Sequence, residues 1–276
     1  MSASSEKPNI VVVGGSFVGS KAAELIGAEM YKTHRTILIE RNTHFNNLFA
    51  FPRYAVVPKH EHRAFLPYTT MFAHLLPGAV SVHRGRVTEI QADRVVLEGE
   101  ESIPYEYLVI ATGTRLTPPG SMITDTKPEG IAYFQAHQQA VEKAQKIVII
   151  GGGANGVQLA TDIKDFYPDK SVTIVHPRPR LMHAFHPALH DIVSARCAEL
   201  GIDVILNDRA RIPPGGFPTD GSTFNVELAS GKHIPADLAI MATGQTPNSA
   251  PLRPCCSPPL HCPIPLSDAE PSMRCC

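Results

Sequence analysis

The chain has 276 residues, of which 43% are hydrophobic and 18% charged, and its formal net charge is −1. This composition is typical of a globular protein that is long enough for one large or two medium domains. The near-neutral balance argues against a nucleic-acid or anionic-membrane surface, and no apolar run approaches the roughly 20 residues that span a bilayer.

The ends of the chain differ from its body. Residues 1–8 precede the first expected strand and are too few and too polar for a signal or transit peptide. Cys197 is the one cysteine before residue 250, whereas a secreted disulfide scaffold distributes its cysteines through the fold. We therefore expect a cytoplasmic protein.

The first half begins with a strand, a helix and a second strand. Residues 9–13 are largely apolar, as in a buried parallel strand, and residues 17–30 carry apolar side chains at helical spacing. Residues 36–40 then predict the second strand, which completes a βαβ unit. Short antiparallel strands are expected at 80–82, 85–90 and 94–97, followed by a strand that ends in Ala111, Thr112 and Gly113.

The second half repeats this plan after a helix expected at 135–143. The expected elements are strands at 146–150, 171–175 and 202–206, helices at 157–166 and 187–200, a hairpin at 224–234, and a strand before Ala242, Thr243 and Gly244. Such self-similarity predicts an α/β protein with two Rossmann-like (doubly wound, βαβ) nucleotide-binding domains, each with a small antiparallel β excursion. The predicted domains are 8–120 and 121–248, followed by an irregular tail at 249–276 that is rich in proline and cysteine.

A glycine-rich turn closes the first strand. Gly14 lets the chain turn tightly, and Gly19 permits close packing of the helix on the strand. Ser16 stands where this motif normally has glycine, and its hydroxyl can donate to a phosphate at the helix N-terminus. Glu40 ends the second strand, where a carboxylate can bind ribose hydroxyls. The alternative is a tight strand–helix turn without a ligand.

The second turn retains all three motif glycines, Gly151, Gly153 and Gly156. Its following strand ends in His176 rather than an acid, and Arg178 and Arg180 come soon after. A carboxylate there would repel a 2′-phosphate, whereas an arginine would pair with it. The sequence therefore permits NADPH as well as NADH. Two solvated loop arginines are the alternative interpretation.

The paired turns, the two Ala-Thr-Gly strand ends and residues 244–248 together resemble the FAD/NAD(P)-dependent pyridine nucleotide-disulfide oxidoreductase superfamily. Residues 45–53 and 167–170 are similar to its apoptosis-inducing-factor-like (ferroptosis-suppressor-like) branch. The likeness runs from about residue 8 to residue 248. It implies an enzyme that transfers a hydride from NADH or NADPH to FAD and passes electrons to a quinone-like or other acceptor.

The expected site residues bind cofactors, and we expect neither a catalytic side chain nor a metal ligand. The resemblance implies that Arg53 lies near the flavin and that the backbone of Val87 meets the adenine. The expected cofactor-binding residues, from the motifs and the resemblance, are Gly14, Gly15, Ser16, Phe17, Val18, Gly19, Glu40, Arg53, Val87, Ala111, Thr112, Gly113, Gly151, Gly153, Gly156, His176, Arg178, Arg180 and Gly244.

Two departures from the family pattern limit the chemistry that we expect at the cofactor sites. Residues 41–60 contain no cysteine, which excludes a redox cysteine pair there, and Gln158 replaces the glutamate usual after the second turn. His183, His186 and His190 straddle the start of an expected surface helix, which is favoured over a zinc site. Peripheral membrane contact and the oligomeric state stay open.

The resemblance also implies a further segment after residue 248, with a strand ending in Gly-Asp, but the chain contains no Gly-Asp dipeptide. We therefore expect a C-terminally truncated chain with weakened FAD binding. The alternative function is a catalytically impaired remnant that binds a nucleotide or a partner without turnover.

Overall fold

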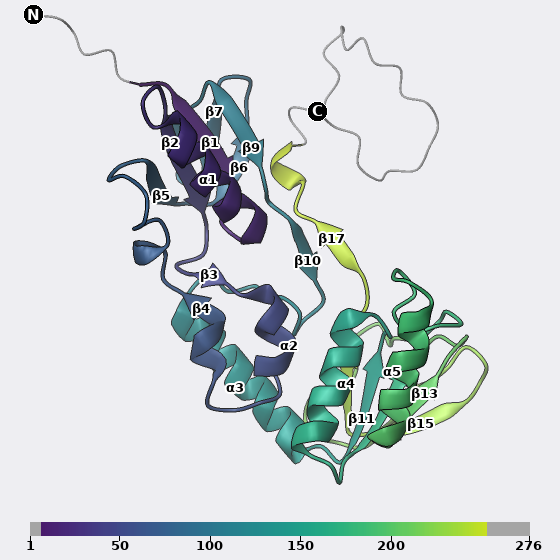
Figure 1. Ribbon diagram of the computed structural model, residues 1–276. Helices are drawn as coiled ribbons and strands as arrows, with labels where there is room; N and C mark the ends of the chain where they lie inside the picture. Colours follow the sequence, from purple (N-terminus) through teal and green to yellow (C-terminus); the bar gives the residue numbers. More distant parts are fainter. Residues whose placement is uncertain (1–6, 253–276) are drawn as a thin grey trace, which may run out of the picture. The chain divides into compact units, whose positions relative to one another are not determined.

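The computed structural model describes residues 7–252 (Figure 1), so nearly all of the expected irregular tail at 249–276 lies outside the described residues. Contacts group the described chain into two compact units. The first unit contains residues 7–43, 67–113 and 247–252, and the second contains residues 44–66 and 114–246. None of the helices within residues 7–252 is long and apolar enough to cross a membrane.

The first unit is built on four parallel strands in the order β5-β2-β1-β9. Every residue of β1 is buried, as its apolar run predicts. Helix α1 connects β1 to β2 and packs against the sheet face that presents Val12 and Leu38. The elements are β1 (Asn9–Val13), α1 (Phe17–Met30), β2 (Arg35–Glu40), η3 (Tyr68–Thr70), β5 (Val80–Arg84) and β9 (Tyr107–Ile110).

The opposite face of this sheet is covered by a three-stranded antiparallel sheet. Side chains of Val11 and Val13 alternate with those that face α1, and they pack against Val95 and Leu97. The covering strands are β6 (Val87–Ile90), β7 (Arg94–Leu97) and β8 (Ser102–Pro104).

One predicted strand was assigned the wrong partner. Residues 80–82 were expected in the antiparallel excursion, but β5 pairs in parallel with β2 from Thr36↔Val80 to Glu40↔Arg84. This strand lies at the edge of the sheet and is largely exposed or half-buried. It therefore lacks the continuous apolar run that marks a central parallel strand.

The second unit repeats the same architecture, with four parallel strands in the order β13-β12-β11-β16. Helices pack on the face that presents Ile147 and Ile149, and the β14–β15 hairpin covers the face that presents Val148 and Ile150. The elements are α3 (Lys127–Lys143), β11 (Lys146–Ile150), α4 (Ala154–Phe166), β12 (Ser171–Val175), α5 (Ala188–Glu199), β13 (Ile202–Ile205), β14 (Phe224–Glu227), β15 (His233–Ala236) and β16 (Leu238–Met241). The predicted α/β fold class is confirmed, with a parallel βαβ sheet in each unit and an antiparallel β excursion on one face of that sheet.

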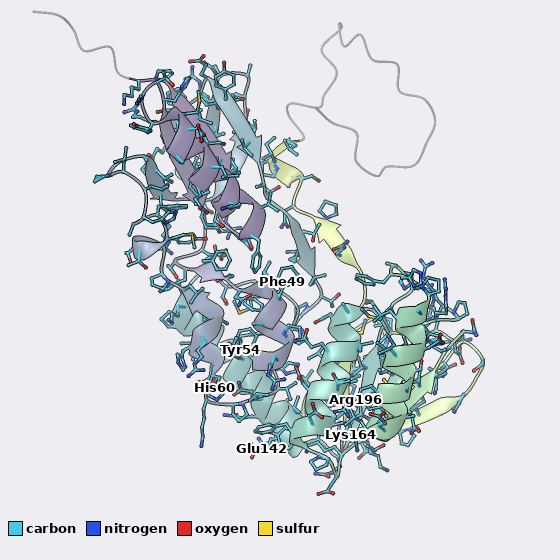
Figure 2. The ribbon with its side chains drawn as sticks, in the orientation of Figure 1. Phe49, Tyr54, His60, Glu142, Lys164 and Arg196 are labelled. Atoms are coloured by element: carbon cyan, nitrogen blue, oxygen red, sulfur yellow. The ribbon has the colours of Figure 1, made fainter. Side chains whose placement is uncertain are left out.

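Residues 44–66 belong to the second unit, although the predicted domain at 8–120 includes them. Their aromatic side chains bury against α3, where the ring centroids of Phe51 and Phe134 lie 5.0 Å apart. Gln138 of α3 also donates to the Tyr54 carbonyl at 2.7 Å. Figure 2 shows Tyr54 on this segment, whose elements are β3 (Phe45–Asn46), η1 (Leu48–Ala50), α2 (Phe51–Tyr54), η2 (Glu61–Ala64) and β4 (Phe65–Leu66).

Ion pairs and short strands complete the second unit. Arg196 of α5 lies 3.1 Å from Asp165 of α4, and Figure 2 labels Arg196. Strands β10 (Thr114–Leu116) and β17 (Gln245–Pro247) form a separate two-stranded pair, and η4 (Ala250–Leu252) belongs to the first unit.

Candidate functional site

The first glycine turn brings three backbone segments into close contact. Gly14 has a φ of +102°, and a side chain there would collide with the carbonyl of Ala111 at the end of β9. A side chain at Gly19 would overlap the carbonyl oxygen of Gly14. Both positions therefore require glycine, which confirms the turn geometry expected from the sequence.

The middle residue of this turn, Gly15, is held on both sides. Its N–H donates to Oε2 of Glu40 at 2.5 Å, and its carbonyl accepts from the Tyr68 hydroxyl at 2.8 Å. Oε1 of Glu40 accepts from the backbone and side chain of Asn42 at 2.9 and 2.7 Å. The Glu40 carboxylate is thus fixed at the end of β2, with 7% of the residue exposed.

Tyr68 has no place in the glycine motif, and sequence reasoning missed it. Burial and the nearby Glu40 carboxylate raise the pKa of its phenol well above the ordinary value. The hydroxyl therefore keeps its proton and remains a donor at any working pH. The residue follows a proline in the 3-10 segment η3, and no periodicity or spacing in the sequence points to the turn.

Ser16 occupies the N-cap of α1. Its Oγ is buried and has no hydrogen-bond partner within the described part of the chain. Donors at a helix N-terminus favour an anion, and a hydroxyl can donate to a phosphate oxygen. Phe17 and Val18 follow in the first turn of the helix, and both side chains are exposed.

A cavity of about 470 Å³ opens beside Glu40 in the first unit. Its wall combines the Glu40 carboxylate and Arg84 with apolar groups such as Phe72 and Val82. Such a lining suits a nucleoside, because the carboxylate can accept from ribose hydroxyls while apolar side chains contact the base. Arg84 is a second lining residue that the sequence analysis did not identify.

The other expected residues of the first unit lie near the strand ends. The Val87 side chain is buried among the apolar residues of the first unit's sheets. Asn248 donates from Nδ2 to the Thr112 carbonyl at 2.9 Å and from its backbone N–H to the Gly113 carbonyl at 2.9 Å. Ala111 directly adjoins Gly14. Their contacts with a cofactor stay a prediction.

The second turn has the same construction. Gly151 has a φ of +125° and adjoins the Ala242 carbonyl, and a side chain at Gly156 would overlap the Gly151 carbonyl. Gly153, at the N-cap of α4, faces open space. The middle residue, Gly152, again has both polar groups engaged, since its N–H donates to Nδ1 of His176 at 3.1 Å. Its carbonyl accepts from the Met182 N–H at 2.8 Å.

His176 is an uncharged hydrogen-bond donor. Burial lowers its pKa, and the positive charges of His183 and Arg178 lower it further. Because Nδ1 accepts from Gly152, the proton of the neutral ring lies on the buried Nε2, and a hydrogen bond with the Arg180 backbone partly offsets the fall in the pKa of His176. Arg178 follows His176 by two residues and is exposed, and Arg180 is half-buried.

Gly244 lies beside a second cavity, of about 400 Å³, in the second unit. Gly244 has a φ of +69°, and the Thr117 hydroxyl donates to the carbonyl of the preceding Thr243. The cavity wall is formed by residues 115–118, 121, 123 and 243–246. That Gly244 contacts a nicotinamide cofactor stays a prediction.

Arg53 forms an ion pair inside the second unit. Its Nη1 lies 2.5 Å from Oδ1 of Asp162 on α4. Burial raises the pKa of Asp162, and the Arg53 charge partly offsets this effect. Oδ2 of Asp162 is buried without a hydrogen-bond partner in the described residues. The expected place of Arg53 near a flavin stays a prediction.

The histidines after the second turn have local roles. Nδ1 of His190 accepts from the Leu181 N–H at 3.2 Å, and Nδ1 of His186 accepts from the Ala188 N–H at 3.3 Å. The rings of His176 and His183 lie 5.3 Å apart. Within residues 7–252, no group of three or more His, Cys, Asp or Glu side chains could hold a metal ion.

Comparison with known proteins matches residues 8–255 to the family described as pyridine nucleotide-disulphide oxidoreductase. The chain is 35% identical over 269 residues to Fe-regulated protein 8 of Mycosarcoma maydis, covering 90% of this chain and 66% of that protein. It is 28% identical over 250 residues to ferroptosis suppressor protein 1 of Taeniopygia guttata, covering 87% of this chain and 64% of that protein.

The fold is also similar to a solved structure, the NAD-dependent persulfide reductase from A. fulgidus. The TM-score is 0.67 at 24% identity, covering 88% of this chain and 47% of that one. The chain thus spans about two thirds of the length of the curated relatives it matches.

Proposed function

Because the chain belongs to the pyridine nucleotide-disulphide oxidoreductase family, we propose that it is an FAD-dependent NAD(P)H oxidoreductase of the apoptosis-inducing-factor-like branch. The first unit would hold FAD and the second NADH or NADPH. The observation that carries this proposal is the shared construction of the two glycine turns. In each turn, the middle glycine donates to a buried side chain at the end of the neighbouring strand.

The residues of the first unit fit FAD. The buried, unpartnered Ser16 Oγ at the N-cap of α1 can donate to the pyrophosphate. The fixed Glu40 carboxylate can accept from the ribose hydroxyls, and the cavity of about 470 Å³ beside it can take the adenosine.

The residues of the second unit fit a nicotinamide dinucleotide and favour NADPH. Glycine at 153 leaves open space at the N-terminus of α4, where a pyrophosphate can approach. His176 puts an uncharged imidazole in place of a carboxylate. An uncharged ring there does not repel a 2′-phosphate, and the exposed Arg178, two residues further along the chain, adds positive charge.

Bound FAD would accept a hydride from the nicotinamide and release electrons to an acceptor. The protein's part is to orient the two cofactors, and no side chain need act as a general base. Residues 41–60, which follow the first βαβ unit, have no cysteine, so we propose transfer to a quinone-like acceptor rather than through a redox cysteine pair at that position.

The test is anaerobic reduction of the purified protein after incubation with FAD. We expect a yellow protein whose flavin absorbance is bleached by NADPH faster than by NADH and restored by a soluble quinone. A yellow protein that neither nucleotide bleaches would contradict hydride transfer. A colourless protein that binds NADPH would support the alternative, a nucleotide-binding remnant without turnover.

A further inference from the structure

Tyr68 reaches the first glycine turn from outside the βαβ unit. Its hydroxyl donates to the Gly15 carbonyl at 2.8 Å, across 53 positions of sequence. The ring packs with the hydrophobic cluster that contains Val12 and Leu38, so the position of the hydroxyl is set by the core of the first unit.

This hydrogen bond controls the direction of a neighbouring N–H. The Gly15 carbonyl and the Ser16 N–H belong to one planar trans peptide, in which the two groups point in opposite directions. Holding the carbonyl toward Tyr68 therefore turns the Ser16 N–H away from Tyr68. Glycine rotates more freely than other residues, so this peptide would otherwise be the least restrained part of the turn.

Ser16 also carries the groups that can meet an anion. It is the N-cap residue of α1, and its Oγ is buried without a hydrogen-bond partner in the described chain. A peptide flip at Gly15 would replace the Ser16 N–H by a carbonyl oxygen and would present a negative dipole to a phosphate.

The second unit restrains its turn in the same way with a different donor. There the Gly152 carbonyl accepts from the Met182 N–H at 2.8 Å, while the Gly152 N–H donates to His176. In both turns, the peptide that follows the middle glycine is thus restrained by a hydrogen bond to its carbonyl, from a side chain in the first turn and from the backbone in the second. This recurrence argues that the restraint serves the turn rather than the local packing of Tyr68.

We propose that Tyr68 is a positioning residue for FAD, because its hydroxyl orients the Gly15–Ser16 peptide so that the Ser16 N–H faces the pyrophosphate. This inference rests on the proposed function, in which the first turn binds FAD. Because the Tyr68 ring itself lines the cavity beside Glu40, the effect on phosphate binding is assigned to the hydroxyl alone, and the ring is left to contact the adenosine.

The test compares ligand binding by wild type and Y68F, which removes the hydroxyl and keeps the ring that lines the cavity beside Glu40. We expect Y68F to bind FAD and ADP about fivefold more weakly, which is the contribution of one neutral hydrogen bond, with adenosine binding unchanged. ADP and adenosine are measured by competition with FAD. Y105F is the matched control, since it removes a hydroxyl of the first unit that donates to the Gln91 carbonyl at 2.5 Å.

The outcomes separate the two proposals. Wild type that binds FAD, together with a Y68F variant that binds FAD equally well, would overturn the role of Tyr68 alone. Equal weakening of ADP and adenosine would also overturn it, because a general structural defect does not distinguish the phosphates. Wild type that fails to bind FAD would overturn the proposed function, and the role of Tyr68 with it.

Discussion

Glu40 and His176 occupy the same place in the two turns, since each accepts a hydrogen bond from the middle glycine. They differ in charge, and this difference predicts nucleotide preference. In H176E, the new carboxylate can still accept from Gly152 but repels a 2′-phosphate. We expect the Kd for NADPH to rise about tenfold, or about 1.4 kcal/mol, while the Kd for NADH is unchanged or lower. Titration calorimetry with both nucleotides measures the effect.

The matched control for this substitution is H233E. His233 is an exposed residue of β15 in the same unit, so the variant makes the same change of charge outside the turn. H176E binding NADPH as tightly as wild type, or H233E showing the same loss, would contradict the role of His176.

At the scale of elements, the Arg53–Asp162 pair joins α2 to α4 within the second unit. Removing Arg53 leaves the buried Asp162 carboxylate without its partner, whereas removing the Asp162 charge leaves a half-exposed arginine that water can solvate. We therefore expect R53M to lower the free energy of unfolding by about 2 kcal/mol and D162N to lower it by less. Urea unfolding of both variants provides the measurement.

The double variant tests whether this coupling is direct. If the cost of R53M is the stranded carboxylate, R53M/D162N should be close to D162N alone. The comparison pair is R196M and D165N, which breaks an ion pair of 3.1 Å between two half-exposed side chains and should change stability by less than about 1 kcal/mol. Strictly additive losses for Arg53 and Asp162 would refute the coupling.

The sequence predicts those elements whose burial is uniform along the strand. Residues 9–13 and 146–150 are central parallel strands, buried on both faces, and their apolar runs identify them. Strand β5 was given the wrong partner because an edge strand shows no such run. Similarly, the close approach of Gly14 and Gly19 follows from motif spacing. The contacts of Tyr68 and Arg53 do not, since they join residues 53 and 109 positions apart through tertiary packing.

The assignment of residues 44–66 shows the same limit at a larger scale. Sequence order places them in the first domain, but Phe51 and Phe65 are buried with Phe134 of α3. Chain order does not reveal which core an amphipathic segment joins. That choice depends on which unit offers an apolar surface to cover.

At the scale of the whole molecule, the two units have separate hydrophobic cores, so each ligand should stabilise its own unit. The buried hydrophobic clusters of the first unit include Val11 and Leu38, and those of the second unit include Ile149 and Val226. A ligand present at about 100 times its Kd stabilises the state that binds it by about 2.7 kcal/mol, which slows amide exchange by up to about 100-fold.

Hydrogen-exchange mass spectrometry should therefore show FAD protecting peptides from residues 9–40 and NADPH protecting peptides from residues 146–176. At the same NADPH concentration, H176E should show about tenfold less protection by NADPH and keep that from FAD. Protection of residues 9–40 by NADPH alone would reverse the assignment of the two cofactors, because the ligand would then be bound by the turn that carries Glu40.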